Sequence, residues 1–154
     1  MVPQKIIVHC LDTKNGVDVS VEEVNSWHKA RGWAGIGYHW LISAPEGVIR
    51  AGRPPDMAGA HCEGQNSDSL GIALVGRDKF SEAQWQSLFG LIKACQNRWD
   101  IDNSLVCVHN EFASAKKQGK TCPNFSGALL REFMEKNSIE VVKANLLPTG
   151  GAKA

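Results

Sequence analysis

Three side chains in this sequence have the chemistry of a zinc site: the imidazoles of His9 and His109 and the thiol of Cys122. Two nitrogen ligands and one thiolate suit tetrahedral Zn²⁺, and three protein ligands leave the fourth position for water, as a catalytic zinc requires. The two histidines are 100 residues apart, and each also fits a hydrogen-bonded core position. Spacing alone therefore favours the interpretation as core histidines.

The segments that carry the two histidines are predicted to be buried strands. Residues 6–10 are a short run that is rich in β-branched side chains, and residues 105–109 are a similar apolar run. Residues 70–75 form a third strand candidate of the same kind. Because side chains alternate along a strand, Cys10 is expected to point away from His9 and to be buried.

Capping signals predict where the helices begin. Ser20 and Ser81 each precede a Glu or Gln by three residues, which is the capping-box pattern. The first helix then runs up to Gly32, and the second carries apolar side chains at helical spacing through Trp99. A third helix is predicted over residues 126–136.

The remaining segments complete a mixed α/β fold. Residues 38–43 and 48–53 flank a Pro- and Gly-containing turn and are predicted to pair as a hairpin. Residues 54–69 form a long polar loop of the kind that borders functional sites. We predict a central mixed β-sheet flanked by helices, with residues 1–137 as the catalytic domain and residues 138–154 as a peripheral C-terminal tail.

Composition narrows the classes of function. Of the 154 residues, 43% are hydrophobic and 21% are charged, which is typical of a soluble globular domain. A formal net charge of +1 without a dense basic block argues against nucleic acid as substrate. No apolar run approaches a membrane span, no signal peptide is recognisable, and the five cysteines lack the spacing of a disulfide scaffold. We therefore expect a monomer that is made in the cytoplasm and has no membrane partner.

The other histidines and cysteines are given structural roles. His39 follows Tyr38 and should point to the opposite face of its strand, and His28 on the first helix fits packing or favourable charge near the helix end. Cys107 has the same strand parity as His109, but buried cysteine is the commoner outcome, so we leave it outside the ligand set.

Several motifs, taken in order, point to a known family: VHC at residues 8–10, GWAGIGYHWLI at 32–42, GAHCEGQNSDSLGIALVG at 59–76, and VHNEF and KTCPNF within 108–125. Together they resemble the type 2 N-acetylmuramoyl-L-alanine amidases, a superfamily that includes phage lysozyme-amidases and peptidoglycan-recognition proteins. The resemblance covers about residues 5–135 and implies the fold of that superfamily.

The resemblance also implies a site. It places the zinc ligands on His9, His109 and Cys122, the trio that ligand chemistry suggests, with one Zn²⁺ per chain. It places the catalytic tyrosine on Tyr38 and the catalytic lysine on Lys120. The lysine carries the charge that an oxyanion needs. The tyrosine either orients water or assists proton transfer, and both roles stay open.

The implied substrate is peptidoglycan, cut between N-acetylmuramic acid and L-alanine. His61 and Asn66 match positions that line the substrate groove of the family, although both residues also fit local bracing of the loop by hydrogen bonds. Tyr38 favours the phage type of enzyme over cytoplasmic recycling amidases. We therefore expect an endolysin that accumulates in the host cytoplasm and reaches the wall through a membrane lesion.

Two functions of other classes compete with this interpretation. Some relatives in the superfamily bind wall fragments without cutting them, but such binders typically lose the cysteine ligand, and Cys122 is present here. The second alternative is a thiol hydrolase with Cys122 as nucleophile and His109 as base. A metal chelator separates the alternatives, because it stops zinc chemistry and spares a thiol enzyme.

Overall fold

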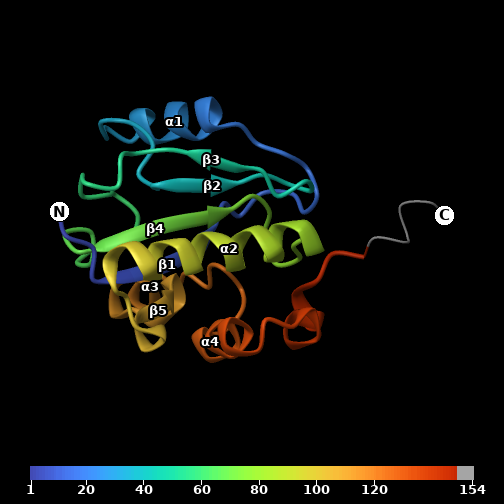
Figure 1. Ribbon diagram of the computed structural model, residues 1–154. Coiled ribbons are helices and arrows are strands. Elements are labelled where there is room, and N and C mark those ends of the chain that lie inside the picture. Colours follow the sequence, from blue (N-terminus) through green and yellow to red (C-terminus); the bar gives the residue numbers. More distant parts are fainter. Residues whose placement is uncertain (149–154) are drawn as a thin grey trace.

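The computed structural model describes residues 1–148, in which five strands form one sheet with helices on both faces (Figure 1). The strands are β1 (Lys5–Cys10), β2 (Trp40–Ile42), β3 (Ile49–Ala51), β4 (Ser69–Leu74) and β5 (Val106–Val108). The α-helices are α1 (Val21–Ala30), α2 (Glu82–Trp99), α3 (Ala113–Lys117) and α4 (Gly127–Lys136), and the 3₁₀ turns are η1 (Asn103–Leu105), η2 (His109–Glu111) and η3 (Ile139–Asn145). The predicted mixed α/β class is confirmed.

The sheet has the strand order β3-β2-β4-β1-β5. β1 lies between β4 and β5 and runs parallel to both, while β4 is also parallel to β2. β2 and β3 pair antiparallel, so the predicted hairpin is confirmed, although each strand has only three paired residues. The sheet is therefore mixed, and its parallel part brings the carboxyl ends of β1, β4 and β5 to one edge.

The predicted helix starts are confirmed by their hydrogen bonds. The Ser20 hydroxyl accepts from the Glu23 amide at 3.1 Å, and the Glu23 carboxylate accepts from the Ser20 amide at 3.2 Å. Ser81 and Gln84 make the same reciprocal pair at the start of α2. The short helix α3, which lies in a Lys-rich segment between β5 and α4, was not predicted.

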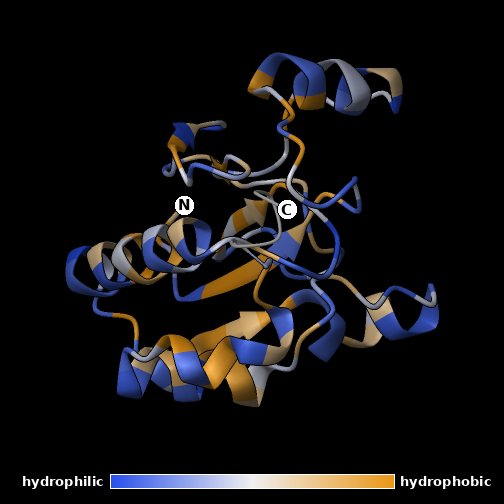
Figure 2. Cartoon of the chain, turned by 90° about the vertical axis from the view of Figure 1, so that its right-hand side faces the viewer, coloured by the Kyte–Doolittle hydropathy of each residue, from blue (hydrophilic) through white to orange (hydrophobic). Residues whose placement is uncertain are grey.

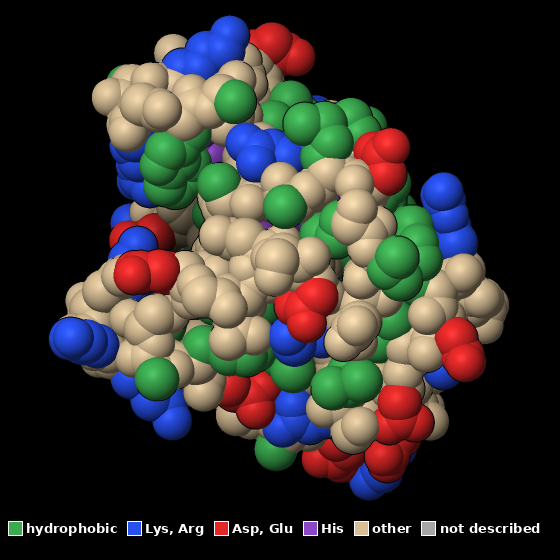
Figure 3. Space-filling model, turned by 90° about the vertical axis from the view of Figure 1, so that its left-hand side faces the viewer, with side chains coloured by type: hydrophobic (Ala, Val, Ile, Leu, Met, Phe, Trp, Pro, Cys, Tyr) green, Lys and Arg blue, Asp and Glu red, His purple; other side chains and the backbone are tan. Residues whose placement is uncertain are grey.

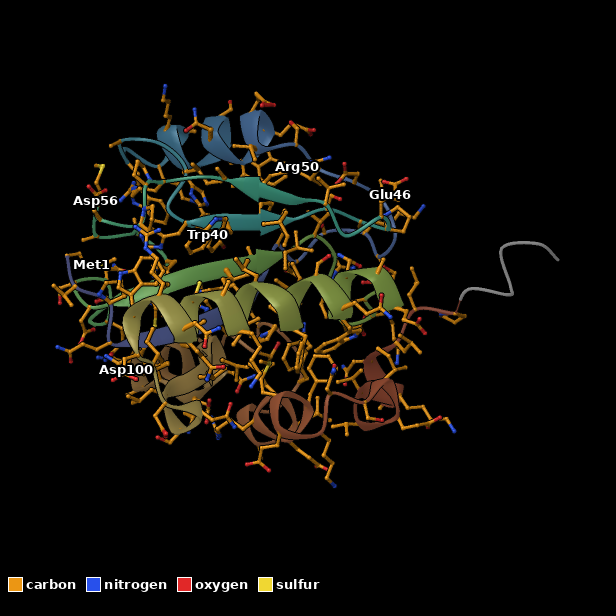
Figure 4. The ribbon with its side chains drawn as sticks, in the orientation of Figure 1. Met1, Trp40, Glu46, Arg50, Asp56 and Asp100 are labelled. Carbon is orange, nitrogen blue, oxygen red and sulfur yellow. The ribbon has the colours of Figure 1, made fainter. Side chains whose placement is uncertain are left out.

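One face of the sheet is packed by α2 and α4 with large apolar side chains. Trp85 of α2 contacts the rings of Phe125 and Phe133, with centroids 4.9 and 5.3 Å away. In Figure 2 the strands are mainly orange, and the helices alternate orange and blue around their axes, as amphipathic helices do. Trp40 projects from β2 on this side (Figure 4), and its centroid lies 6.5 Å from that of Trp99. This face holds the larger hydrophobic cluster.

The opposite face carries α1 and a smaller apolar cluster. Val24 of α1 packs there with Leu41, Ala73 and Val75 from the sheet. An ion pair between Arg50 of β3 and the segment before α1 lies at the edge of this face (Figure 4). Buried histidines, rather than further apolar side chains, fill the rest of the face near the strand ends.

The segment after α4 needs a correction within the part that the structure describes. We expected residues beyond 137 to be peripheral, but η3 places Val142 in the larger cluster with its side chain fully buried. Phe80 also pairs with Leu146 through an isolated β-bridge, and the Trp85 indole donates to the Asn145 carbonyl at 3.3 Å. The domain boundary at residue 137 stays a prediction, and the expected tail over residues 149–154 lies outside the described residues.

Among residues 1–148, no helix combines the length and the apolar character needed to cross a bilayer.

Candidate metal centre and its cleft

The candidate metal centre lies where β1 and β5 end. These strands are parallel with Val8 opposite Val108, so the next residues, His9 and His109, come side by side. Their ring centroids are 4.5 Å apart. Cys122 joins them from the segment after α3, and the candidate ligand atoms of the three residues all lie within 4.8 Å of one another. The sheet register thus brings together residues that are far apart in the sequence.

Hydrogen bonds hold Cys122 in this position. Its carbonyl accepts from the Asn110 amide at 3.0 Å, which ties its loop to the start of η2. The Asn110 side chain also donates to the carbonyls of Thr121 and Phe125. From β1, the Cys10 amide donates to the Cys122 sulfur at 2.9 Å. A donor directed at sulfur favours the thiolate, which is the form that binds metal ions.

The electrostatic environment keeps both imidazoles neutral. Burial, together with the neighbouring His61 and His109 rings, holds the pKa of His9 well below its usual value. Burial and then the charge of Lys120 lower the pKa of His109 to about 4. The neighbouring Cys10 thiol and burial raise the pKa of Cys122. Neutral imidazoles have the free lone pair that a metal ligand needs.

The donor set fits Zn²⁺ better than Mg²⁺ or Ca²⁺. Two nitrogens and one sulfur are the ligands of catalytic zinc sites, whereas Mg²⁺ and Ca²⁺ prefer oxygen ligands. His9 and His109 are 1% and 8% exposed, so the three groups converge at the bottom of a cleft rather than at the surface. One side of the cluster faces that cleft, which leaves room for water and substrate.

The structure places Tyr38 beside this cluster. Its ring centroid is 5.2 Å from that of His9, and the residue lines the same cleft. Burial and the nearby Cys122 and Cys10 sulfurs raise the pKa of the phenol. Tyr38 therefore keeps its hydroxyl proton and can donate a hydrogen bond into the cleft.

Lys120 also lines the cleft. Helix α3 ends at Lys117, and Gly119 then adopts a left-handed φ of 71° before Lys120. The Lys120 side chain is exposed and lines the cleft, and its charge acts on both His9 and His109. The neighbouring Lys116 and Lys117 do not line the cleft, which separates three lysines that look alike in the sequence.

The two predicted groove residues, His61 and Asn66, are both engaged with the protein. The Asn66 carbonyl oxygen accepts from the amides of His61 and Cys62, each at 2.9 Å, so it braces the loop. His61 is only 9% exposed, and its ring nitrogens lie 2.9 Å from His9 and 3.3 Å from Ser69. Substrate contact by these two residues stays a prediction.

The cleft has a volume of about 410 Å³, and one wall was not predicted from the sequence. Trp27, Arg31 and Trp33 form this wall at the end of α1, with the Arg31 guanidinium 5.4 Å from the Trp33 ring centroid. Trp27 lies at helical spacing with Val24, yet it is 43% exposed. In Figure 3 the surface is hollowed at its upper left, and histidine shows there only as small purple spots between other atoms.

His28 and His39 lie outside the converging group and bond to the backbone, although His28 also lines the cleft, and Cys107 is only partly buried. The His28 ring accepts from the Gly37 amide at 2.8 Å, and the His39 ring accepts from the Gly71 amide at 3.0 Å. Cys107 is not part of the converging group among the described residues.

Comparison with known proteins identifies the class that this fold and site define. A family profile described as N-acetylmuramoyl-L-alanine amidase (Amidase_2) matches residues 1–125. The chain belongs to this family. It is therefore an amidase, a hydrolase of the amide bond from which the family takes its name.

Similar proteins of known class agree with this assignment. The chain is 35% identical to an endolysin of Klebsiella phage KP32, over 88% of this chain and 87% of that protein. It is 36% identical to an endolysin of Escherichia phage T7, over 87% of each. A solved structure of the N-acetylmuramoyl-L-alanine amidase LysC from Clostridium intestinale URNW matches with a TM-score of 0.74 and 27% identity, over 88% of this chain and 86% of that one.

Proposed function

We propose that this amidase is a zinc-dependent endolysin that cleaves peptidoglycan between N-acetylmuramic acid and L-alanine. The observation that carries the proposal is the convergence of His9, His109 and Cys122, with ligand atoms within 4.8 Å, at the bottom of a cleft. Zinc bound to these three residues supplies a Lewis acid that activates water and polarises the scissile carbonyl.

The protein's own residues supply the remaining chemistry. Lys120 carries a positive charge into the cleft beside the histidines, where it stabilises the oxyanion that develops as the amide carbon becomes tetrahedral. Tyr38 keeps its hydroxyl proton and donates a hydrogen bond toward the reacting group. A protonated phenol suits both the orientation of water and proton transfer to the leaving amine, so Tyr38 serves in one of these two roles.

The cleft wall suits a substrate with both sugar and peptide parts. Trp27 and Trp33 present aromatic faces of the kind on which sugar rings stack, and Arg31 offers a cation to the carboxylates of a stem peptide. The similarity to phage endolysins supports a role in host lysis. In that role the protein acts as a monomer that accumulates in the cytoplasm and reaches the wall after the membrane has been breached.

Product analysis tests this function directly. Digestion of purified peptidoglycan should release peptides with a free L-alanine amino terminus and leave the glycan strands uncut, because Asp12 is the single acidic residue among the described residues that line the cleft, and glycoside hydrolysis needs a pair of carboxylates. New reducing sugar ends would contradict the proposal.

A chelator distinguishes the two competing functions from this one. The zinc enzyme should lose activity when the metal is removed and regain it with Zn²⁺, whereas a thiol hydrolase should stay active throughout. A wall-binding module would bind peptidoglycan and release no peptide in either condition.

A further inference from the structure

A chain of hydrogen bonds runs from the candidate metal centre into the protein behind it. His9 Nε2 lies 2.9 Å from His61 Nδ1, and His61 Nε2 lies 3.3 Å from the Ser69 hydroxyl. The Ser69 hydroxyl in turn lies 2.6 Å from the Gln65 carbonyl oxygen. All of these groups except the carbonyl can either donate or accept, so the carbonyl sets the direction of the whole chain.

The Gln65 carbonyl at the end of the chain determines where each proton lies. A carbonyl only accepts, so the Ser69 hydroxyl gives its one proton to Gln65 and must accept from His61 Nε2–H. A neutral imidazole has one N–H, which leaves His61 Nδ1 as an acceptor. The remaining bond therefore requires His9 to donate from Nε2, and the lone pair of His9 is then on Nδ1.

The sheet provides a special place for the His61 ring. Gly71 of β4 has no side chain, and a Cβ at this position would lie 2.6 Å from His61 Cγ and 2.9 Å from Nδ1. A Cβ at Gly59 would likewise lie 2.6 Å from His61 Cδ2. Two glycines thus leave just enough room for an imidazole to lie against the backbone, with its Nδ1 directed at His9.

We propose that His61 is a positioning residue that fixes His9 as the Nε2–H tautomer, so that His9 offers Nδ1 to the metal. The inference rests on the proposed function, since it presumes that His9 is a zinc ligand. Metal-binding histidines generally donate their second N–H to a fixed acceptor, and loss of that acceptor weakens metal affinity by roughly 10- to 100-fold. Here the acceptor is a second imidazole, which is itself oriented by Ser69.

Zinc affinity of three variants tests the proposal. His61→Ala removes the acceptor and should weaken Zn²⁺ binding by roughly 10- to 100-fold. In His61→Asn the amide oxygen lies near the former place of Nδ1, so most of the affinity should return. His39→Ala is the matched control, because His39 is a similarly buried imidazole close to His61 that does not bond to His9. It should retain wild-type affinity.

The outcomes separate positioning from packing. Wild-type affinity in folded His61→Ala, or equal losses in His61→Asn and His61→Ala, would overturn the proposal. An equal loss in His39→Ala would also overturn it, because zinc affinity would then depend on any buried imidazole nearby and not on the bond to His9. Absence of zinc binding by the wild-type protein would instead overturn the proposed function.

Nitrogen NMR of the metal-free wild-type protein tests the tautomer without any zinc. The proposal predicts that the His9 ring proton is on Nε2 in the wild-type protein and exchanges between both nitrogens in His61→Ala. A proton on His9 Nδ1 in the wild-type protein would overturn it.

Discussion

The two faces of the sheet bury different kinds of side chain. On the face covered by α2 and α4, large apolar and aromatic side chains pack against one another, with Trp85 and Phe133 fully or almost fully buried. On the face covered by α1, His9, His39 and His61 are buried instead, next to a small apolar cluster. Alternate residues of the same strands, such as Val8 and His9, serve the two faces.

The difference shows how the chain supports a polar site within a small domain. A buried polar group destabilises the fold unless it has hydrogen-bond partners, and the imidazoles of the α1 face have such partners in the protein. The apolar face contributes the stability that allows this arrangement. Substitutions in the apolar cluster under α2 and α4 should therefore lower the free energy of unfolding. Substitutions at the site on the α1 face should mainly change zinc binding or catalysis.

The largest effect is expected for Cys122→Ala. Loss of the thiolate should abolish zinc binding at stoichiometric concentrations and reduce amidase activity below detection, while the metal-free fold remains. Metal analysis and peptidoglycan digestion measure both effects. Cys95→Ala is the matched control, since Cys95 is buried in α2 on the apolar face. Full zinc content in Cys122→Ala would remove this residue from the ligand set.

The opposite result is expected for Phe133→Ala in α4. Deleting this buried ring should lower the free energy of unfolding by about 3–5 kcal/mol, as for other large-to-small core changes. Zinc affinity and activity per folded molecule should stay unchanged, because the side chain lies on the far face. Chemical denaturation and assays at low temperature measure the two quantities. A folded variant that had lost its activity would break the division between the faces.

Lys120→Ala should damage catalysis and spare both metal and fold. Removal of one oxyanion donor typically lowers kcat by roughly 10²- to 10³-fold. Lys116→Ala and Lys117→Ala are internal controls, since these side chains do not line the cleft, and their activity should stay close to wild type. Turnover and zinc content are measured for each variant. Comparable activity in all three would exclude Lys120 from the mechanism.

The pH dependence of stability should show the contribution of His28 on the α1 face. Burial, followed by the charges of Arg31 and Arg53, lowers the pKa of His28 to about 4 from its usual value near 6.5. The unfolded chain therefore binds a proton at His28 more readily than the folded chain does. The contribution of neutral His28 to the free energy of unfolding is thus complete above pH 6.5 and is lost as the pH falls toward 4.

Denaturation of the metal-free protein at pH 7 and near pH 4 measures this loss. His28→Asn keeps an acceptor for the Gly37 amide and removes the titrating group, so its stability should fall less over the same window. An equal fall in the variant and the wild-type protein would assign the pH dependence to the other histidines.

Local patterns in the sequence predicted most elements of the fold. The β-branched run before His9 and the capping residues Ser20 and Ser81 act through neighbouring residues, and the structure confirms them. The burial of Val142 differs from the peripheral position expected for residues beyond 137, and the exposure of Trp27 was not predicted. Both depend on which surfaces meet in space, and an apolar residue at helical spacing looks the same in either case.

The residues of the candidate site could be predicted, but the contacts that hold them in place could not. Ligand chemistry and the family resemblance both suggested His9, His109 and Cys122, and the parallel register of β1 and β5 brings the two histidines together. The bond from His9 to His61, and the room that Gly71 leaves for that ring, depend on the position of a long loop on the sheet. No periodicity in the sequence encodes that position.

Titration of the metal-free protein with Zn²⁺, followed by the release of L-alanine amino termini from peptidoglycan, tests the central claim most directly. Protein stripped of metal should be inactive, and activity should rise linearly and level off at one equivalent of Zn²⁺ per chain. Activity that persists without metal, or that does not return when Zn²⁺ is added to the folded protein, would contradict a zinc centre built from His9, His109 and Cys122.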